Sequence, residues 1–186
     1  MASKIDLISN ALILIGDTPI NALTGGTRRE TVASKLYDNI VQNELTKHRW
    51  GFARKKAQIS RLTETPVDPN GWRSIYQLPT DLLFLVTVTP DSNYQIYGDK
   101  VYSNSTQALY ADYIYNVPEA DWPVYFAKMI EYALAMDFAA SIRDSSAARG
   151  EMASAYVNAS RMARFTDSQQ YPTEQIRSNP FVNVRF

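Results

Sequence analysis

Residues 33–62 read ASKLYDNIVQNELTKHRWGFARKKAQISRL, and residues 72–81 read WRSIYQLPTD. The first stretch begins with apolar residues at helical spacing and passes through a tryptophan into a basic segment of alternating polarity. The second stretch also alternates and ends in Leu-Pro-Thr-Asp. Together they predict a helix that runs into a sheet, with Trp50 and Phe52 as large anchors at the junction.

The composition restricts the chemistry that the chain can perform. Its 186 residues suit one domain, or one domain with an insertion, and the 19 basic and 19 acidic side chains cancel. A neutral chain has no overall attraction to nucleic acid or to an anionic membrane. Cysteine is absent and His48 is the single histidine, which excludes disulfides, cysteine nucleophiles and multi-histidine metal sites. We therefore expect no cofactor and no metal.

A membrane partner is not expected either. No apolar run approaches the roughly 20 residues that a membrane helix needs. Lys4 and Asp6 stand near the start, and the apolar run over 11–15 is too short for a signal peptide.

Four segments have helical periodicity. The first two begin with capping boxes, Ser3 with Asp6 and Thr27 with Glu30. The third follows Pro123 and is broadly apolar, and the fourth runs over 147–165. For that last helix the spacing predicts a buried side made of Met152, Ala155, Tyr156, Ala159, Met162 and Ala163.

Between the helical pairs the period changes to two, which predicts strands. Expected strands cover 72–78, 82–88 and 108–117, and a tight hairpin covers 94–102 around Gly98. A further half-buried strand is expected within 47–61, where Ala57 and Ile59 alternate with Gln58 and Ser60. Six of the twelve tyrosines lie between 94 and 115. They predict cross-strand packing, and the alternative is a surface that contacts a carbohydrate or a partner protein.

These elements predict an α+β fold. The N- and C-terminal helix pairs are expected to form a four-helix bundle that carries an inserted antiparallel β lobe and is followed by an extended C-terminal arm. The predicted domains are a helical bundle domain (1–52 and 118–167), an inserted β domain (53–117) and the arm (168–186).

The arm has a pattern of its own. Residues 168–186 lack helical periodicity, and Pro180 opposes a helix across them. Apolar residues then alternate with Asn183 and Arg185, which favours an arm that adds onto another surface. The predicted partner-binding residues in the arm are Tyr171, Pro172, Phe181, Val182, Val184 and Phe186.

The expected basic strand within 47–61 includes Arg54, Lys55 and Lys56, and residues 47–61 contain six basic and no acidic residues. One interpretation is a solvated strand edge that lysines protect from pairing. The other is a contact patch for phosphate or a partner, and we include the three residues among the predicted partner-binding residues.

Five motifs along the chain carry a family resemblance. They are Asn10-Ala11-Leu12 through Gly16-Asp17-Thr18-Pro19-Ile20, Ala33 with Leu36-Tyr37-Asp38, Trp50-Gly51-Phe52-Ala53, Tyr76-Gln77-Leu78-Pro79-Thr80-Asp81, and Trp122-Pro123 with Phe126. In this order they resemble the tail tubular protein A family, the head-to-tail adaptors of short-tailed bacteriophages.

The resemblance implies a structural virion protein without catalytic activity. Copies would form a ring of about twelve, as closed heterologous interfaces allow. The ring would join the portal protein to the tail nozzle protein and let viral DNA pass without sequence-specific binding. The implied location is the head–tail interface of the virion, after synthesis in the cytoplasm of the bacterial host.

Two other functions remain open at this point. A tail-associated glycan hydrolase would need two carboxylates about 5–10 Å apart across a cleft, and the candidates are Asp81, Asp91, Asp99 and Asp112. A DNA-binding module would use the cations of residues 47–61 and would bind with a steep dependence on salt.

Overall fold

The computed structural model describes residues 3–24, 26–66, 71–90 and 93–170. It contains four α-helices, two short 3-10 helices and six strands. The helices are α1 (Lys4–Leu14), α2 (Arg28–Thr46), η1 (Gly51–Ala53), η2 (Glu119–Asp121), α3 (Val124–Ser141) and α4 (Ser146–Ser168). The strands are β1 (Arg54–Arg61), β2 (Ser74–Gln77), β3 (Leu82–Thr89), β4 (Tyr94–Tyr97), β5 (Lys100–Ser103) and β6 (Leu109–Tyr115).

Both predicted capping boxes are present. Ser3 and Asp6 exchange hydrogen bonds at the start of α1, and Thr27 and Glu30 do so at the start of α2. Each box provides partners for amide groups that the first helical turn leaves without an intrahelical acceptor. The predicted hairpin is also confirmed, since β4 and β5 pair around Gly98, whose φ of 62° suits glycine.

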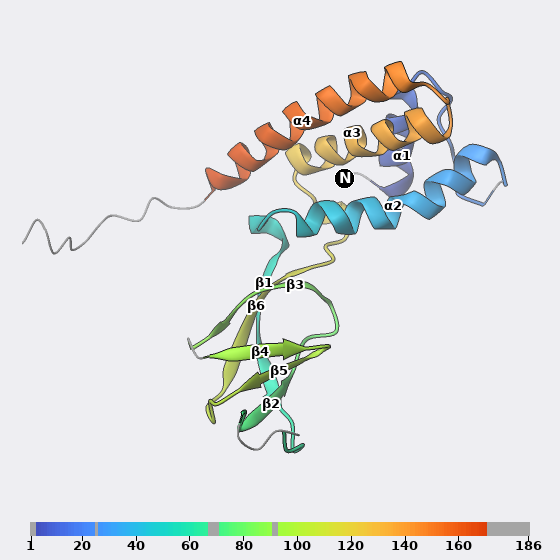
Figure 1. The fold of residues 1–186 in the computed structure, drawn as a ribbon. Helices are drawn as coiled ribbons and strands as arrows, with labels where there is room; N and C mark the ends of the chain where they lie inside the picture. Colours follow the sequence, from blue (N-terminus) through green and yellow to red (C-terminus); the bar gives the residue numbers. More distant parts are fainter. Residues whose placement is uncertain (1–2, 25, 67–70, 91–92, 171–186) are drawn as a thin grey trace, which may run out of the picture.

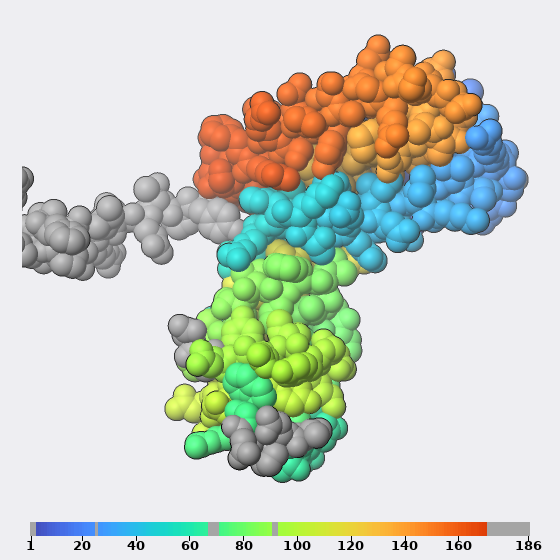
Figure 2. Space-filling view, in the orientation of Figure 1, coloured from blue at the N-terminus to red at the C-terminus, as the bar shows by residue number. Residues whose placement is uncertain are grey.

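The six strands form one antiparallel sheet in the order β3-β6-β1-β2-β5-β4, and it curls into a nearly closed, barrel-like shape. β1 pairs with β6 over six residues, from Arg54 opposite Ile114 to Ile59 opposite Leu109. These two strands run side by side from the helices into the sheet (Figure 1). Figure 2 shows the sheet projecting from one side of the helical layer.

The predicted four-helix bundle with an inserted lobe is wrong. The sheet separates the helices into two pairs along the chain, and α3 is the shared neighbour that packs against α1, α2 and α4. The physical reason lies in α3 itself, which is buried on several sides rather than along one stripe. Its buried residues are Phe126, Met129, Ile130, Glu131, Ala133, Leu134, Ala135, Phe138 and Ala139.

An aromatic cluster forms the core where the helices meet the sheet. The Trp50 ring is 1% exposed, lies 5.1 Å from Phe126 and meets it edge to face. Trp122 and Phe52 contact the same Phe126 ring at 5.0 and 4.9 Å. The predicted anchoring of the junction by Trp50 and Phe52 is therefore confirmed. A second, smaller core inside the sheet contains Ile59, Tyr76, Leu78, Val88, Val101, Leu109, Ala111 and Tyr113.

The division into domains at 52/53, 117/118 and 167/168 stays a prediction. The residues of the arm from 171 onward lie outside the described residues, and so do all six of its predicted partner-binding residues, Tyr171, Pro172, Phe181, Val182, Val184 and Phe186. No helix in the described ranges combines the length and apolar character that crossing a membrane requires.

Candidate functional site

The three predicted contact residues of β1 are exposed, but two of them already have acidic partners. Arg54 forms an ion pair with Asp112 on β6, and Lys55 Nζ lies 2.7 Å from an Asp81 carboxylate oxygen. Lys56 is exposed and has no ion pair within the described residues. The start of β1 therefore presents one uncompensated cation, which is weak support for a phosphate-binding patch.

This arrangement makes Lys56 the informative position for mutation. Reversing Arg54 or Lys55 would place like charges beside Asp112 or Asp81 and disturb the sheet itself. Lys56 lies opposite Asp112 in the β1–β6 pairing, so a neutral replacement is needed to avoid facing two carboxylates. We expect Lys56→Gln to change the free energy of unfolding by less than about 0.5 kcal/mol, as is usual for exposed positions. If β1 contacts a partner, the same variant lowers the yield of assembled complex on a sizing column. Unchanged assembly would assign β1 to a solvated surface.

The carboxylates considered for hydrolysis are committed to other contacts. Tyr113 donates a hydrogen bond to Asp81, and the hydrogen bond from Lys55 lowers the pKa of the same carboxyl. A hydrogen bond from Gln77 lowers the pKa of Asp99. A glycosidase acid needs a raised pKa, so these contacts do not favour that role. Asp91 lies outside the described residues.

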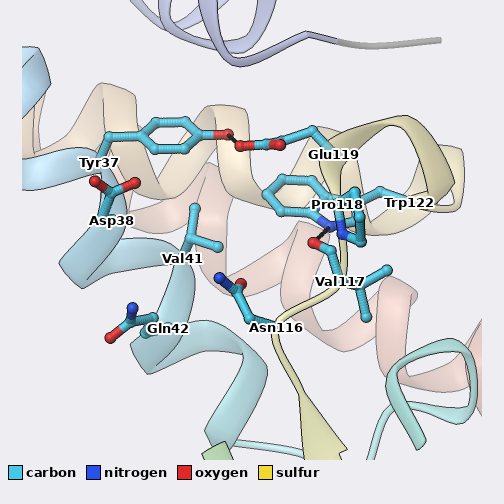
Figure 3. Close-up of a pocket in the computed structure, with 9 residues that line it drawn as sticks. All are labelled: Tyr37, Asp38, Val41, Gln42, Asn116, Val117, Pro118, Glu119 and Trp122. Atoms are coloured by element: carbon cyan, nitrogen blue, oxygen red, sulfur yellow. Dashed lines mark hydrogen bonds between the residues drawn. The ribbon is translucent and has the colours of Figure 1, made fainter. Parts of the chain in front are cut away.

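A small hollow lies between α2 and the link from β6 to α3 (Figure 3). Its volume is about 170 Å³, below the roughly 300–1,000 Å³ of ordinary ligand pockets. Tyr37 donates a hydrogen bond of 3.2 Å to Glu119 across it, and Trp122 donates from Nε1 to the carbonyl of Val117. Burial and the Glu119 charge raise the pKa of Tyr37, which keeps this phenol protonated. The hollow is a hydrogen-bonded junction that is smaller than an ordinary ligand pocket.

The outer side of α4 carries large apolar residues in contact with water. Phe165 is 57% exposed and Met162 is 61% exposed. The buried residues of α4 are Ser160, Ala163 and Asp167, which lie on the opposite side of the helix. We call the exposed set the α4 stripe, and it consists of Val157, Met162 and Phe165 with Arg161 between them.

The α4 stripe corrects one prediction and adds a surface that the sequence analysis missed. Met162 was expected on the buried side and is instead exposed. The spacing of Val157, Arg161 and Phe165, four residues apart, places them on one face and could have identified it. A shallow hollow of about 390 Å³ lies beside the stripe, lined by Tyr156, Val157, Ser160, Arg161 and Arg164.

A buried carboxylate ties the end of α4 to the helix–sheet junction. Asp167 is fully buried and accepts hydrogen bonds from the Gly51 amide at 3.1 Å and from the Tyr125 hydroxyl at 2.9 Å. His48 Nε2 lies 3.7 Å away. Burial lowers the pKa of His48, the Asp167 charge opposes this shift, and Arg164 adds to it. The predicted capping or packing role of His48 agrees with its edge-to-face contact with Trp50 at 4.7 Å.

No group of three or more His, Cys, Asp or Glu side chains in the described part of the chain is placed to hold a metal ion. No protein-family model matches the sequence, and a search of curated proteins finds no match. The surfaces of the sheet and of α4, together with the motif resemblance, are therefore what bears on function.

Proposed function

We propose that this chain is a structural virion protein, the subunit of an adaptor ring between the portal protein and the tail nozzle of a short-tailed bacteriophage, with viral DNA passing through the ring. The observation that carries the assembly role is the α4 stripe. An exposed phenylalanine on a surface helix, one turn from an exposed methionine and two turns from an exposed valine, is typical of a protein–protein interface. The motif resemblance supplies the identity of the partners.

The motif residues support the proposal through their positions. Four of the five motifs contribute to one core, through residues that include Leu12, Tyr37, Trp50 and Phe126. The fifth places Tyr76 and Leu78 in the sheet core. The resemblance therefore concerns residues of the two hydrophobic cores, as expected when two chains share a fold.

The rival functions have less support from the contacts. The carboxylates of the sheet have cations or amides as partners, and the cations at the start of β1 are largely neutralised. A DNA channel needs few strong phosphate contacts if the duplex is to slide, and a neutral subunit suits that requirement.

The direct test mixes the full-length chain with the portal protein and examines the product by negative-stain electron microscopy. We expect a closed ring attached to the portal, whereas the chain alone can stay monomeric. A stable monomer that ignores the portal but releases sugar from bacterial cell wall or capsule would reverse the assignment in favour of the hydrolase.

Phe165 provides a sharper test of the interface. We expect Phe165→Asp to abolish ring attachment and to leave folding intact, because the side chain is largely in water in the monomer. Ile13→Asp on α1 is the matched control, since Ile13 is 55% exposed. Ring yield by sedimentation and melting by circular dichroism give the two readouts. Equal ring yields from both variants would remove α4 from the interface.

A further inference from the structure

The two edges of the sheet differ in how they are protected. The edge strand β3 has register shifts between Leu82 and Phe84 and between Leu85 and Thr87, which disturb a regular edge. The other edge strand, β4, pairs residue for residue with β5 and contains neither lysine nor proline. Among the described residues β4 has β5 as its single pairing partner, so the sheet, although nearly closed, leaves the second side of β4 unpaired.

The inner face of the sheet is also incomplete at β4. Ile96 lies opposite Val101 of β5, and paired residues project to the same face. Val101 is fully buried in the sheet core, whereas Ile96 is 48% exposed. Within the described residues, the apolar interior therefore continues to β4, where Ile96 is only half covered. One more strand beside β4 would bury Ile96 and extend the core.

We propose that β4 accepts residues 181–186 of a neighbouring copy as an additional strand. The inference rests on the proposed ring and specifies how adjacent copies are linked. In an extended FVNVRF segment, Val182, Val184 and Phe186 fall on one face, and Phe181, Asn183 and Arg185 on the other. The apolar face matches the open interior at Ile96. The mixed face matches the outer side of β4, where Gln95 and Tyr97 are exposed.

The length of the chain permits this exchange between subunits. The last turn of α4 is held at the helix–sheet junction by Asp167, and residues 169–186 follow. With residues 181–186 in the added strand, the ten residues 171–180 make the connection, and when fully extended they span about 35 Å, a reach that allows the arm to leave its own subunit. Main-chain hydrogen bonds to β4 would supply affinity, and the alternating apolar side chains would fix the register.

The absence of cysteine allows a direct cross-linking test. Two full-length variants, Gln95→Cys and Asn183→Cys, are mixed and oxidised, both with and without the portal protein. Both positions lie on the outer face, and facing residues of paired strands are within disulfide range. We expect a mixed dimer on a non-reducing gel. Tyr110→Cys on the inner strand β6 replaces Gln95→Cys as the control and should not cross-link to Asn183→Cys.

A second variant tests the apolar contact. Adding Ile96→Lys to the Gln95→Cys chain should reduce the cross-linked fraction at least several-fold, because it places a charge on the open interior. Tyr97→Lys, on the outer face of the same strand, should leave that fraction largely unchanged. Circular dichroism verifies that both chains fold.

Each outcome separates this inference from the proposed function. A mixed dimer in either condition supports strand exchange. Its absence in both conditions overturns the inference, and electron micrographs of the same samples show independently whether the ring forms. A chain that carries both Gln95→Cys and Asn183→Cys gives a further check. If it cross-links only within itself, the arm pairs with β4 of its own subunit, and the exchange between copies is overturned.

Discussion

Trp50→Ala is expected to lower the free energy of unfolding by about 3–5 kcal/mol, the range for deleting a large buried aromatic side chain. The indole is 1% exposed and contacts His48, Phe52 and Phe126. Its Nε1 donates a hydrogen bond of 3.0 Å to the carbonyl of Glu44, which would lose this partner. Since domains are stable by about 5–15 kcal/mol in total, the variant should be close to unfolding at 37 °C.

Urea denaturation measures this loss, and Trp72→Ala serves as the control. Trp72 is half-buried and stands outside both hydrophobic cores. We expect its removal to cost much less than the removal of Trp50. If both variants lose the same free energy of unfolding, the Trp50 cluster at the helix–sheet junction contributes no more to stability than the contacts of Trp72.

Asp167→Ala is expected to destabilise the fold by about 2–4 kcal/mol, because each buried donor that loses its acceptor costs about 1–3 kcal/mol. The donors concerned are the Gly51 amide and the Tyr125 hydroxyl. Asp167→Asn keeps the shape and one acceptor oxygen, so its loss should be smaller. Thermal or urea unfolding of both variants gives the comparison.

A double-mutant cycle with Tyr125→Phe tests whether the Asp167 hydrogen bonds, rather than packing alone, stabilise the end of α4. If Asp167 and Tyr125 act through their hydrogen bond, the double variant loses less free energy of unfolding than the sum of the two single variants. Strictly additive losses would contradict a coupled cluster at the end of α4.

The features predicted correctly from sequence depend on neighbours along the chain. Ser3 caps α1 through Asp6 three residues later, and the β4–β5 hairpin needs only its own turn. The period of two between the helices likewise predicted strands, because alternating polarity reports burial on one face of a sheet. Such features need no knowledge of the tertiary arrangement.

The features missed depend on residues far apart in sequence. Asp167 meets Gly51 across 116 positions, and no local pattern marks a carboxylate as buried. The bundle prediction failed because helices with apolar residues on several sides do not reveal how many neighbours they have. Met162 was predicted to be buried for a related reason. An apolar residue at the edge of a helix's apolar face can pack into the core or lie at an interface, and the spacing alone does not distinguish the two.

The paired strands β1 and β6 also determine how the molecule would transmit force. Both connect the sheet to the helical layer at the same end, so a pull on the sheet stretches two covalent chains together in the same sense. Their mutual hydrogen bonds are then spared from shear, and the connection resists extension with the stiffness of the backbone. Sideways bending is resisted by non-covalent packing at the junction, which includes Trp50, Trp122 and Ile114. The connection is therefore expected to be stiffer against a pull along β1 and β6 than against sideways bending.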